Sequence, residues 1–229
     1  MSFTRLKKAV SHLHNLQILH LPTRMVIDRP DSTAGKWPPN LRLMRLGGVL
    51  DPDAMRNFDW PPALSELILS ESSNLNTATI ENILQNDQLA SSLKRLCFLP
   101  GHKKPLGGLP TYALFSLPHL TTLEMPLSLL PDLKLLNYGP EALPIRELIF
   151  LSEDADALDN TVDYTGEIFE ALHTNLRNLF FLSIPRTLVS LWTDEMVANM
   201  DETIMNHLDE ASDDELEDIV LEGLGLRVS

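Results

Sequence analysis

The sequence is poor in cysteine and in aromatic residues. Its 229 residues contain one cysteine, Cys97, and 6% aromatic residues. A single cysteine excludes a disulfide framework and any zinc module built on several cysteines. No stretch approaches the roughly 18 consecutive apolar residues of a membrane span, the first residues lack the apolar core of a secretory signal, and no Asn-x-Ser/Thr acceptor occurs. These absences favour a reducing compartment, and we expect a cytoplasmic or nuclear protein that does not contact a membrane.

Positive charge is missing from one long stretch of the chain. Between Asp194 and Glu222 there are 12 acidic residues and no lysine or arginine, whereas the rest of the chain has 20 acidic and 18 basic residues. The formal net charge of −14 therefore belongs almost entirely to this stretch. We predict a nearly neutral domain over residues 1–192, followed by an acidic helical cap or tail over residues 193–229. Nucleic acid is not expected as a partner.

Leucine is the most abundant residue, with 45 copies, and it recurs in a fixed pattern. The pattern Leu-x-x-Leu-x-Leu, with Met, Ile or Phe allowed, occurs seven times, beginning at Leu16, Leu41, Leu64, Leu93, Leu120, Ile145 and Leu179. The first positions are separated by 25, 23, 29, 27, 25 and 34 residues. Repeats of this length, about 20–29 residues, stack side by side and bury a shared core. The last copy can also start at Leu176, so its register stays open.

The repeat pattern predicts parallel strands joined by variable connections. The second and third apolar positions of each copy alternate along a short strand and point into the core. Apolar residues at helical spacing predict helices over Thr77–Asp87 and Tyr164–His173. The connections over residues 101–110 and 127–144 contain too much proline and glycine for long helices. The predicted fold class is therefore α/β, with a curved parallel sheet of about seven repeats.

Two phrases in the chain are typical of a known repeat family. Trp37-Pro38-Pro39-Asn40-Leu41 is repeated as Trp60-Pro61-Pro62-Ala63-Leu64, and Leu-Pro-x-Leu-x-x-Leu also occurs. The chain resembles leucine-rich repeat proteins of the ribonuclease-inhibitor-like kind, and its repeat style is similar to that of fungal F-box/leucine-rich-repeat proteins. That resemblance implies substrate recognition for a cullin-type ubiquitin ligase, joined to the ligase adaptor by an F-box. The F-box is absent here, because the first strand is expected by Leu16, so an upstream segment would have to supply it. The usual Asn or Cys after each strand is also missing.

The residues that face away from the leucine core form two columns on the predicted sheet. Nine of them are candidate partner-binding residues: Arg45, Glu66, Ile68, Arg95, Cys97, Glu124, Glu147, Ile149 and Phe181. Large apolar groups and charges of both signs mix on this face, which is typical of a protein-binding surface. The alternative is that loops of the chain itself cover part of the sheet.

Signals for catalysis are weak. Cys97 has no histidine tied to it by a motif, as a thiolate nucleophile would require. His12 and His14 have no further ligand at metal spacing, and the glycine-rich stretch Gly101–Gly108 lacks the ending of a phosphate-binding loop. We expect no catalytic residues, no metal and no cofactor. The alternatives kept open are a scaffold or regulator without a ubiquitin link, and an enzyme that uses Cys97 or His12 and His14.

The acidic segment has a regular apolar stripe. Val197, Met200, Ile204 and Leu208 lie on one side of a predicted helix, and Ser212–Glu215 resembles the capping box of a second helix. A helix that caps the exposed end of the core is favoured. An acidic docking segment for a basic partner is the alternative.

Overall fold

The fold is described from a computed structural model. It describes residues 3–21, 35–47, 55–56, 58–70, 76–99, 109–130, 142–152, 162–210 and 225–228. The chain forms two compact units, Met1–Leu120 and Thr121–Ser229. Each unit has parallel strands and helices, so the coarse prediction of an α/β fold is confirmed. The predicted boundary between residues 192 and 193 lies within the second unit and stays a prediction.

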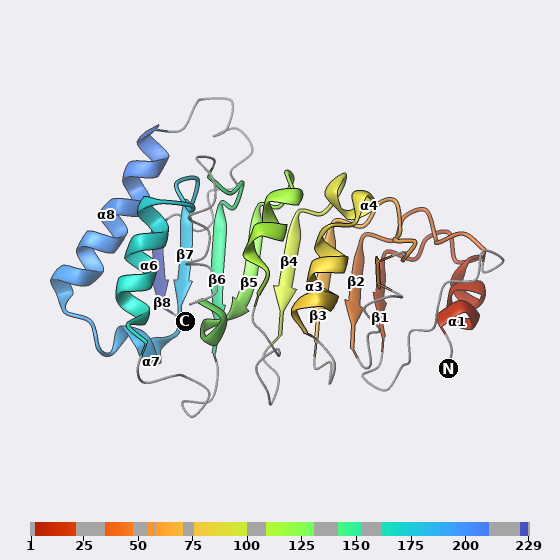
Figure 1. Cartoon of the computed structure of the whole chain (residues 1–229), viewed down its shortest axis with the longest axis horizontal. Helices are drawn as coiled ribbons and strands as arrows, with labels where there is room; N and C mark the ends of the chain where they lie inside the picture. Colours follow the sequence, from red (N-terminus) through yellow and green to blue (C-terminus); the bar gives the residue numbers. More distant parts are fainter. Residues whose placement is uncertain are drawn as a thin grey trace. The chain divides into compact units, whose positions relative to one another are not determined.

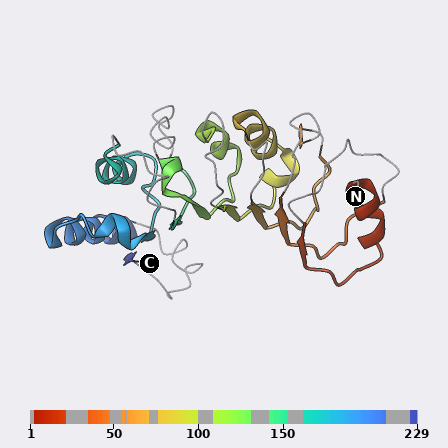
Figure 2. The same cartoon turned by 90° about the horizontal axis from the view of Figure 1, so that it is seen from below.

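The described residues of the first unit form four parallel strands, which Figure 1 labels β1 to β4. They are β1 (Ile18–His20), β2 (Leu43–Leu46), β3 (Glu66–Leu69) and β4 (Arg95–Phe98), paired in chain order. The other elements are α1 (Phe3–Val10), α3 (Thr77–Leu84), α4 (Asp87–Ala90) and the 3-10 helix η1 (Thr111–Ser116). Figure 2 shows α3 on one side of these strands.

The part of the second unit that the structure describes also has four parallel strands in chain order. They are β5 (Thr122–Pro126), β6 (Glu147–Leu151), β7 (Phe181–Ile184) and β8 (Gly225–Val228). Between them lie the 3-10 helix η2 (Leu127–Leu129) and the helices α6 (Tyr164–His173), α7 (Arg186–Val189) and α8 (Asp194–Glu210). In Figure 2, α6 lies on one side of β6 and β7. No described helix combines the length and the apolar character that a bilayer crossing demands.

The strand register reproduces the repeat pattern read from the sequence. Met44 aligns with Leu67, Leu67 aligns with Leu96, and in the second unit Leu148 aligns with Leu182. The last pairing confirms the copy that starts at Leu179. From Leu41 onward, the first, second and third apolar positions of every copy are at most 2% exposed. The repeated leucines are therefore the core, as predicted.

Two backbone features recur from one copy of the pattern to the next. The first leucine of five copies donates its N–H to the carbonyl three residues earlier, at Leu13, Pro38, Pro61, Leu117 and Leu176. The carbonyl of the residue just before each of five strands also accepts two N–H groups. They belong to the residue just before the next strand and to the first residue of that strand. The five acceptors are Gln17, Arg42, Ser65, Thr121 and Arg146. The shared turn and the shared acceptor hold neighbouring strands in the same register.

The first copy is buried less completely than the sequence predicts. Leu16 and Leu19 are only half-buried, although Leu21 is buried. Among the described strands, β1 pairs with β2 alone. A strand with a neighbour on one side only leaves more of its apolar row open to water.

The two Trp-Pro-Pro phrases have a structural reason. Trp37 and Trp60 are both buried, and Phe58 lies between them, its ring centroid 6.4 Å from that of Trp37 and 4.5 Å from that of Trp60. Trp37 Nε1–H donates to the Asp59 carbonyl at 2.5 Å. The Asp59 carboxylate also bonds the buried Lys7 ammonium, which lies 5.3 Å from the centre of the Trp37 ring. These contacts hold α1 against the segments that contain Trp37 and Asp59.

The helix predicted over Tyr164–His173 has those bounds as α6, whereas the helix predicted over Thr77–Asp87 ends at Leu84 as α3, and Asp87 begins α4. Both α3 and α6 begin at a side-chain cap. Asn76 accepts the N–H of Thr79 at the start of α3, and Asp163 accepts the N–H of Gly166 at the start of α6, at 3.0 Å. Ile80, Ile83 and Leu84 of α3 are buried, as their spacing predicts. Most of the proline- and glycine-rich connections over residues 101–110 and 127–144 lies outside the described residues.

The acidic segment begins with the predicted helix. Met200 and Ile204 of α8 are fully buried, whereas Val197 and Leu208 are half-buried. The second predicted helix, with Ser212–Glu215 at its start, lies outside the described residues. Strand β8 was not predicted, and it places residues 225–228 beside β7.

Candidate functional site

The two predicted face columns exist as aligned rows across the strands. In the first unit, one row runs through Ile18, Leu43, Glu66 and Arg95, and the other through His20, Arg45, Ile68 and Cys97. In the second unit, the rows run through Thr122, Glu147 and Phe181, and through Glu124, Ile149 and Ser183. We call these rows the strand face of each unit. On β2 and β3 the face residues are half-buried and alternate with fully buried ones.

The strand face of the first unit combines cations with aliphatic side chains. Arg95 lies 3.7 Å from the carboxylate of Glu66, and both side chains are partly exposed. Arg45 Nε–H donates to Ser70 Oγ at 3.2 Å. Ile18 is 50% exposed, and Ile68 is half-buried. This face can therefore offer both charged hydrogen bonds and apolar contact area.

On β5–β7 the strand face of the second unit combines acidic, hydroxyl and apolar side chains. Thr122 Oγ1 lies 3.0 Å from Glu147 Oε2, so the threonine hydroxyl donates to an exposed carboxylate. Ile149 and Phe181 are half-buried beside them in the register. An aromatic and an aliphatic side chain thus lie next to a hydrogen-bonding pair.

Three predicted face positions are buried. Cys97 is 2% exposed, Glu124 is 7% exposed, and Ser183 is also buried. At these positions the strands depart from strict alternation, because consecutive residues of β4, β5 and β7 are buried. The alternative of a partly covered face therefore applies to these three residues. A partner would reach Cys97 or Glu124 only after the atoms over them move.

The sequence interpretation missed two face positions. Gly225 aligns with Phe181, and Arg227 aligns with Ser183, so β8 extends both rows by one strand. Arg227 is exposed. The alternation in Gly225-Leu226-Arg227-Val228 is the signal that could have indicated this strand, but it is too short to separate from a loop.

The other candidate residues do not form a reactive cluster. His12 and His14 are exposed in the turn between α1 and β1, where the sequence places them. Gly101–Gly108 lies outside the described residues. Within the described ranges, no three His, Cys, Asp or Glu side chains come together as metal ligands.

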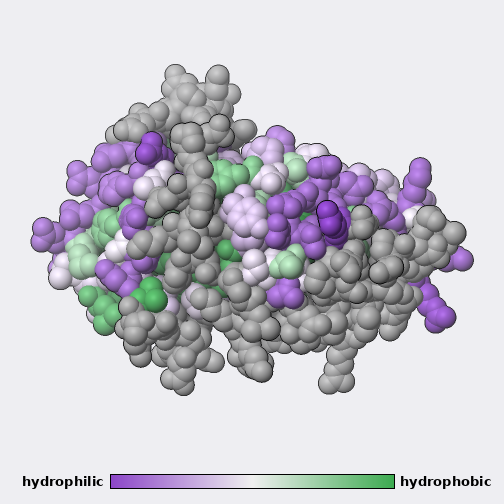
Figure 3. Space-filling view, in the orientation of Figure 1, coloured by the Kyte–Doolittle hydropathy of each residue, from purple (hydrophilic) through white to green (hydrophobic). Residues whose placement is uncertain are grey.

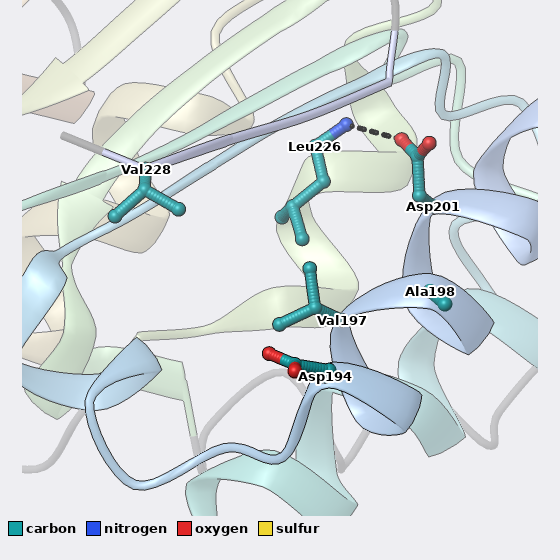
Figure 4. A pocket seen from close by; sticks show the side chains of 6 residues that line it. All are labelled: Asp194, Val197, Ala198, Asp201, Leu226 and Val228. Carbon is teal, nitrogen blue, oxygen red and sulfur yellow. Dashed lines mark hydrogen bonds between the residues drawn. The ribbon is translucent and has the colours of Figure 1, made fainter.

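A cavity of about 350 Å³ lies between α8 and β8 (Figure 4). Val197, Ala198, Leu226 and Val228 line it, together with Asp194 and Asp201. Asp201 Oδ1 accepts the N–H of Leu226 at 2.9 Å. Gly225 has a φ of +86°, and a Cβ there would lie 2.6 Å from that oxygen. Asp201 therefore holds β8 against α8, and glycine is needed for this close approach.

The helix-bearing side is a weaker candidate. Figure 3 shows that its described surface is mostly hydrophilic, with only small hydrophobic areas. The strand faces lie on the other side of the strands.

In comparisons with protein-family models, curated proteins and solved structures, this chain shows no match.

Proposed function

We propose that the chain is a leucine-rich repeat solenoid of the ribonuclease-inhibitor-like kind, with about seven repeats. Support comes from the turn that recurs before five strands, from the carbonyl acceptor that recurs at five strands, and from the buried leucine positions. Each copy of the pattern is one strand with its connection, and a copy alone cannot bury its apolar row.

The proposed activity is binding of another protein on the strand face. The observation that carries it is that partly exposed apolar side chains align with charged ones within each unit. Ile68 aligns with Arg45 in the first unit. In the second unit Ile149 aligns with Glu124, and Phe181 aligns with Glu147. Large apolar side chains on an outward sheet face are costly to leave in water and are typical of binding surfaces. Of the nine predicted binding residues, seven are at least partly exposed: Arg45, Glu66, Ile68, Arg95, Glu147, Ile149 and Phe181.

The biological context that we propose is substrate recognition for a cullin-type ubiquitin ligase. It rests on the similarity of repeat style to fungal F-box/leucine-rich-repeat proteins. A stand-alone scaffold or regulator is the alternative. Recovery of the F-box-binding ligase adaptor with an upstream-extended reading frame supports the ligase context, and repeated failure to recover it favours the scaffold.

We further propose that the function is not enzymatic. Cys97 is buried. Reactive cysteines are usually at least partly exposed, so its position disfavours a reactive thiol. Rapid labelling of the native thiol, or metal found bound to the purified chain, contradicts this proposal.

The decisive experiment changes one residue on each strand face. The double variant Arg95→Glu with Phe181→Ala removes a cation and an aromatic ring from partly exposed positions. We expect weaker capture of binding partners and a nearly unchanged melting temperature, because neither side chain belongs to the leucine core. Affinity capture with quantitative mass spectrometry measures the first quantity, and thermal unfolding measures the second.

A matched control separates the site from overall charge. Arg177→Glu reverses an exposed arginine in the turn before β7, away from the strand face. The control should capture the same partners as the unmodified chain. Equal capture by the double variant would contradict binding on the strand face, and unfolding of the double variant would place its two side chains in the core.

A further inference from the structure

Arg45 differs from the other cation on the strand face of the first unit. Arg95 has the Glu66 carboxylate within 3.7 Å. Within the described part of the chain, the recorded partner of the Arg45 side chain is a neutral hydroxyl, Ser70 Oγ, and no carboxylate pairs with it. Arg45 is only half-buried, so part of the residue is open to solvent.

Ser70 fixes the orientation of that guanidinium. Its side chain is buried, and its hydroxyl donates to the Leu46 carbonyl at 3.0 Å. The same oxygen accepts Arg45 Nε–H at 3.2 Å. The Ser70 backbone N–H also donates to the Leu46 carbonyl, at 2.8 Å. The hydroxyl therefore has a fixed position, and Arg45 loses less side-chain freedom when it binds an anion.

The surroundings of Arg45 are apolar and weakly positive. Its register neighbours are His20 on β1 and Ile68 on β3, and Leu43 precedes it on the same face of β2. Across the face rows of β1–β4 the charged residues are Arg45, Arg95 and Glu66, a net charge of +1 with histidine neutral. The whole chain has a net charge of −14, so this face is locally positive on an acidic protein.

We propose that Arg45 is the anchor for a carboxylate on the partner, which is an extended protein segment with Asp or Glu beside apolar residues. The inference rests on the proposed function and adds the chemistry of the partner. Arginine binds a carboxylate through two parallel N–H···O bonds, while Ile68 and Leu43 supply apolar contacts for the flanking side chains. Ser70 acts as a positioning residue. A nucleic acid does not fit, because the face rows of β1–β4 have a net charge of only +1 and offer no row of cations for successive phosphates.

The test is selection from a random peptide library on the intact chain. Selected peptides are then synthesised twice, once as found and once with each Asp or Glu replaced by Asn or Gln. Fluorescence anisotropy measures the binding of both forms to the unmodified chain, to Arg45→Gln, to Ser70→Ala and to the control Arg177→Gln. The control removes an exposed arginine that lies off the strand face.

We expect selected peptides to be enriched in acidic residues. Replacement of the acidic residues should weaken binding to the unmodified chain by about tenfold or more, and Arg45→Gln should weaken binding of the acidic form equally. The Arg45→Gln variant should no longer distinguish the two forms, because the partner carboxylate has lost its anchor. Ser70→Ala should reduce that distinction without abolishing it, and Arg177→Gln should retain it fully. Partial loss of structure would weaken both peptide forms by the same factor and would keep the distinction between them, and a melting curve identifies a variant that is fully unfolded.

Other outcomes overturn the inference in recognisable ways. Peptides without acidic enrichment, or equal binding to Arg45→Gln, remove the anchor role and leave the proposed binding function intact. The same holds if only phosphorylated versions of the peptides bind, since the anion is then not a carboxylate. A selection that yields no binding peptide also overturns the inference, and the Arg95 and Phe181 double variant then decides the proposed function separately.

Discussion

Leu123 illustrates what one position of the repeat pattern contributes. It is the second leucine of its copy, it is fully buried, and it aligns with Leu148 on the next strand. Leu191 has the same side chain but is 78% exposed in the turn after α7. The two positions have the same side chain and opposite burial, so a comparison of them tests the contribution of the core.

The change Leu123→Ala should lower the free energy of unfolding by about 2–5 kcal/mol, because it removes buried methyl groups and leaves a cavity. The change Leu191→Ala should alter the free energy of unfolding by no more than about 0.5 kcal/mol. Urea unfolding followed by circular dichroism measures both. Similar losses for the two variants would show that Leu123 does not belong to a packed core.

Tyr112 makes the stability of the first unit depend on alkaline pH. A hydrogen bond to the Glu81 carboxylate, with smaller contributions from desolvation and the Glu81 charge, raises the pKa of Tyr112. The stability from this raised pKa is present below the ordinary tyrosine pKa of about 10 and is lost as the pH rises through the folded pKa.

The change Glu81→Gln should therefore lower the pKa of Tyr112 toward its ordinary value. Tyrosinate absorbance, taken as the difference between each protein and its Tyr112→Phe version, measures this pKa. The change Tyr112→Phe should also flatten the alkaline loss of stability. An unchanged titration in Glu81→Gln would exclude the Glu81 carboxylate as the cause.

At the scale of elements, helix boundaries followed local chemistry closely. The sequence predicted a helix over Tyr164–His173, and α6 has those bounds because Asp163 caps it and Ile168 and Leu172 bury its inner side. Strand β8 escaped prediction, because four residues have too little pattern and its place depends on β7 and Asp201.

The change Asp163→Ala should lower the free energy of unfolding of the second unit by about 0.5–2 kcal/mol. The reason is that the N–H of Gly166 loses its acceptor. The change Asp163→Asn keeps an acceptor oxygen and should cost much less. Chemical unfolding compares the two variants. An equal loss of stability in Asp163→Asn and Asp163→Ala would mean that the hydrogen bond from Gly166 N–H does not contribute.

At the scale of the whole molecule, charge and apolar burial are combined in the acidic segment. Residues 194–222 carry nearly all of the net charge, yet α8 within this stretch has two fully buried residues, Met200 and Ile204. Asp201 of the same helix binds β8. These contacts favour a cap, since an acidic docking tail would not need a buried stripe.

The cap predicts that α8 contributes to global stability. Ile204→Ala should lower the free energy of unfolding by about 2–5 kcal/mol. Met205 is the next residue and is 38% exposed, so Met205→Ala should lower it by only about 0.5 kcal/mol. Differential scanning calorimetry measures both variants. If Ile204→Ala leaves the melting temperature unchanged, α8 is a docking tail and not part of the folded body.

The sequence by itself determined the strand register of six copies, most of the buried leucine positions and most of the rows that face away from them, whereas the register of the last copy needed the pairing of β6 with β7. It could do so because these features depend on spacing along the chain, and one spacing recurs seven times. Only the tertiary structure decided that Cys97, Glu124 and Ser183 are buried, that Lys7 pairs with Asp59, and that Ser70 orients Arg45. These features join residues far apart in the chain or depend on atoms packed over a face, and no local pattern encodes them.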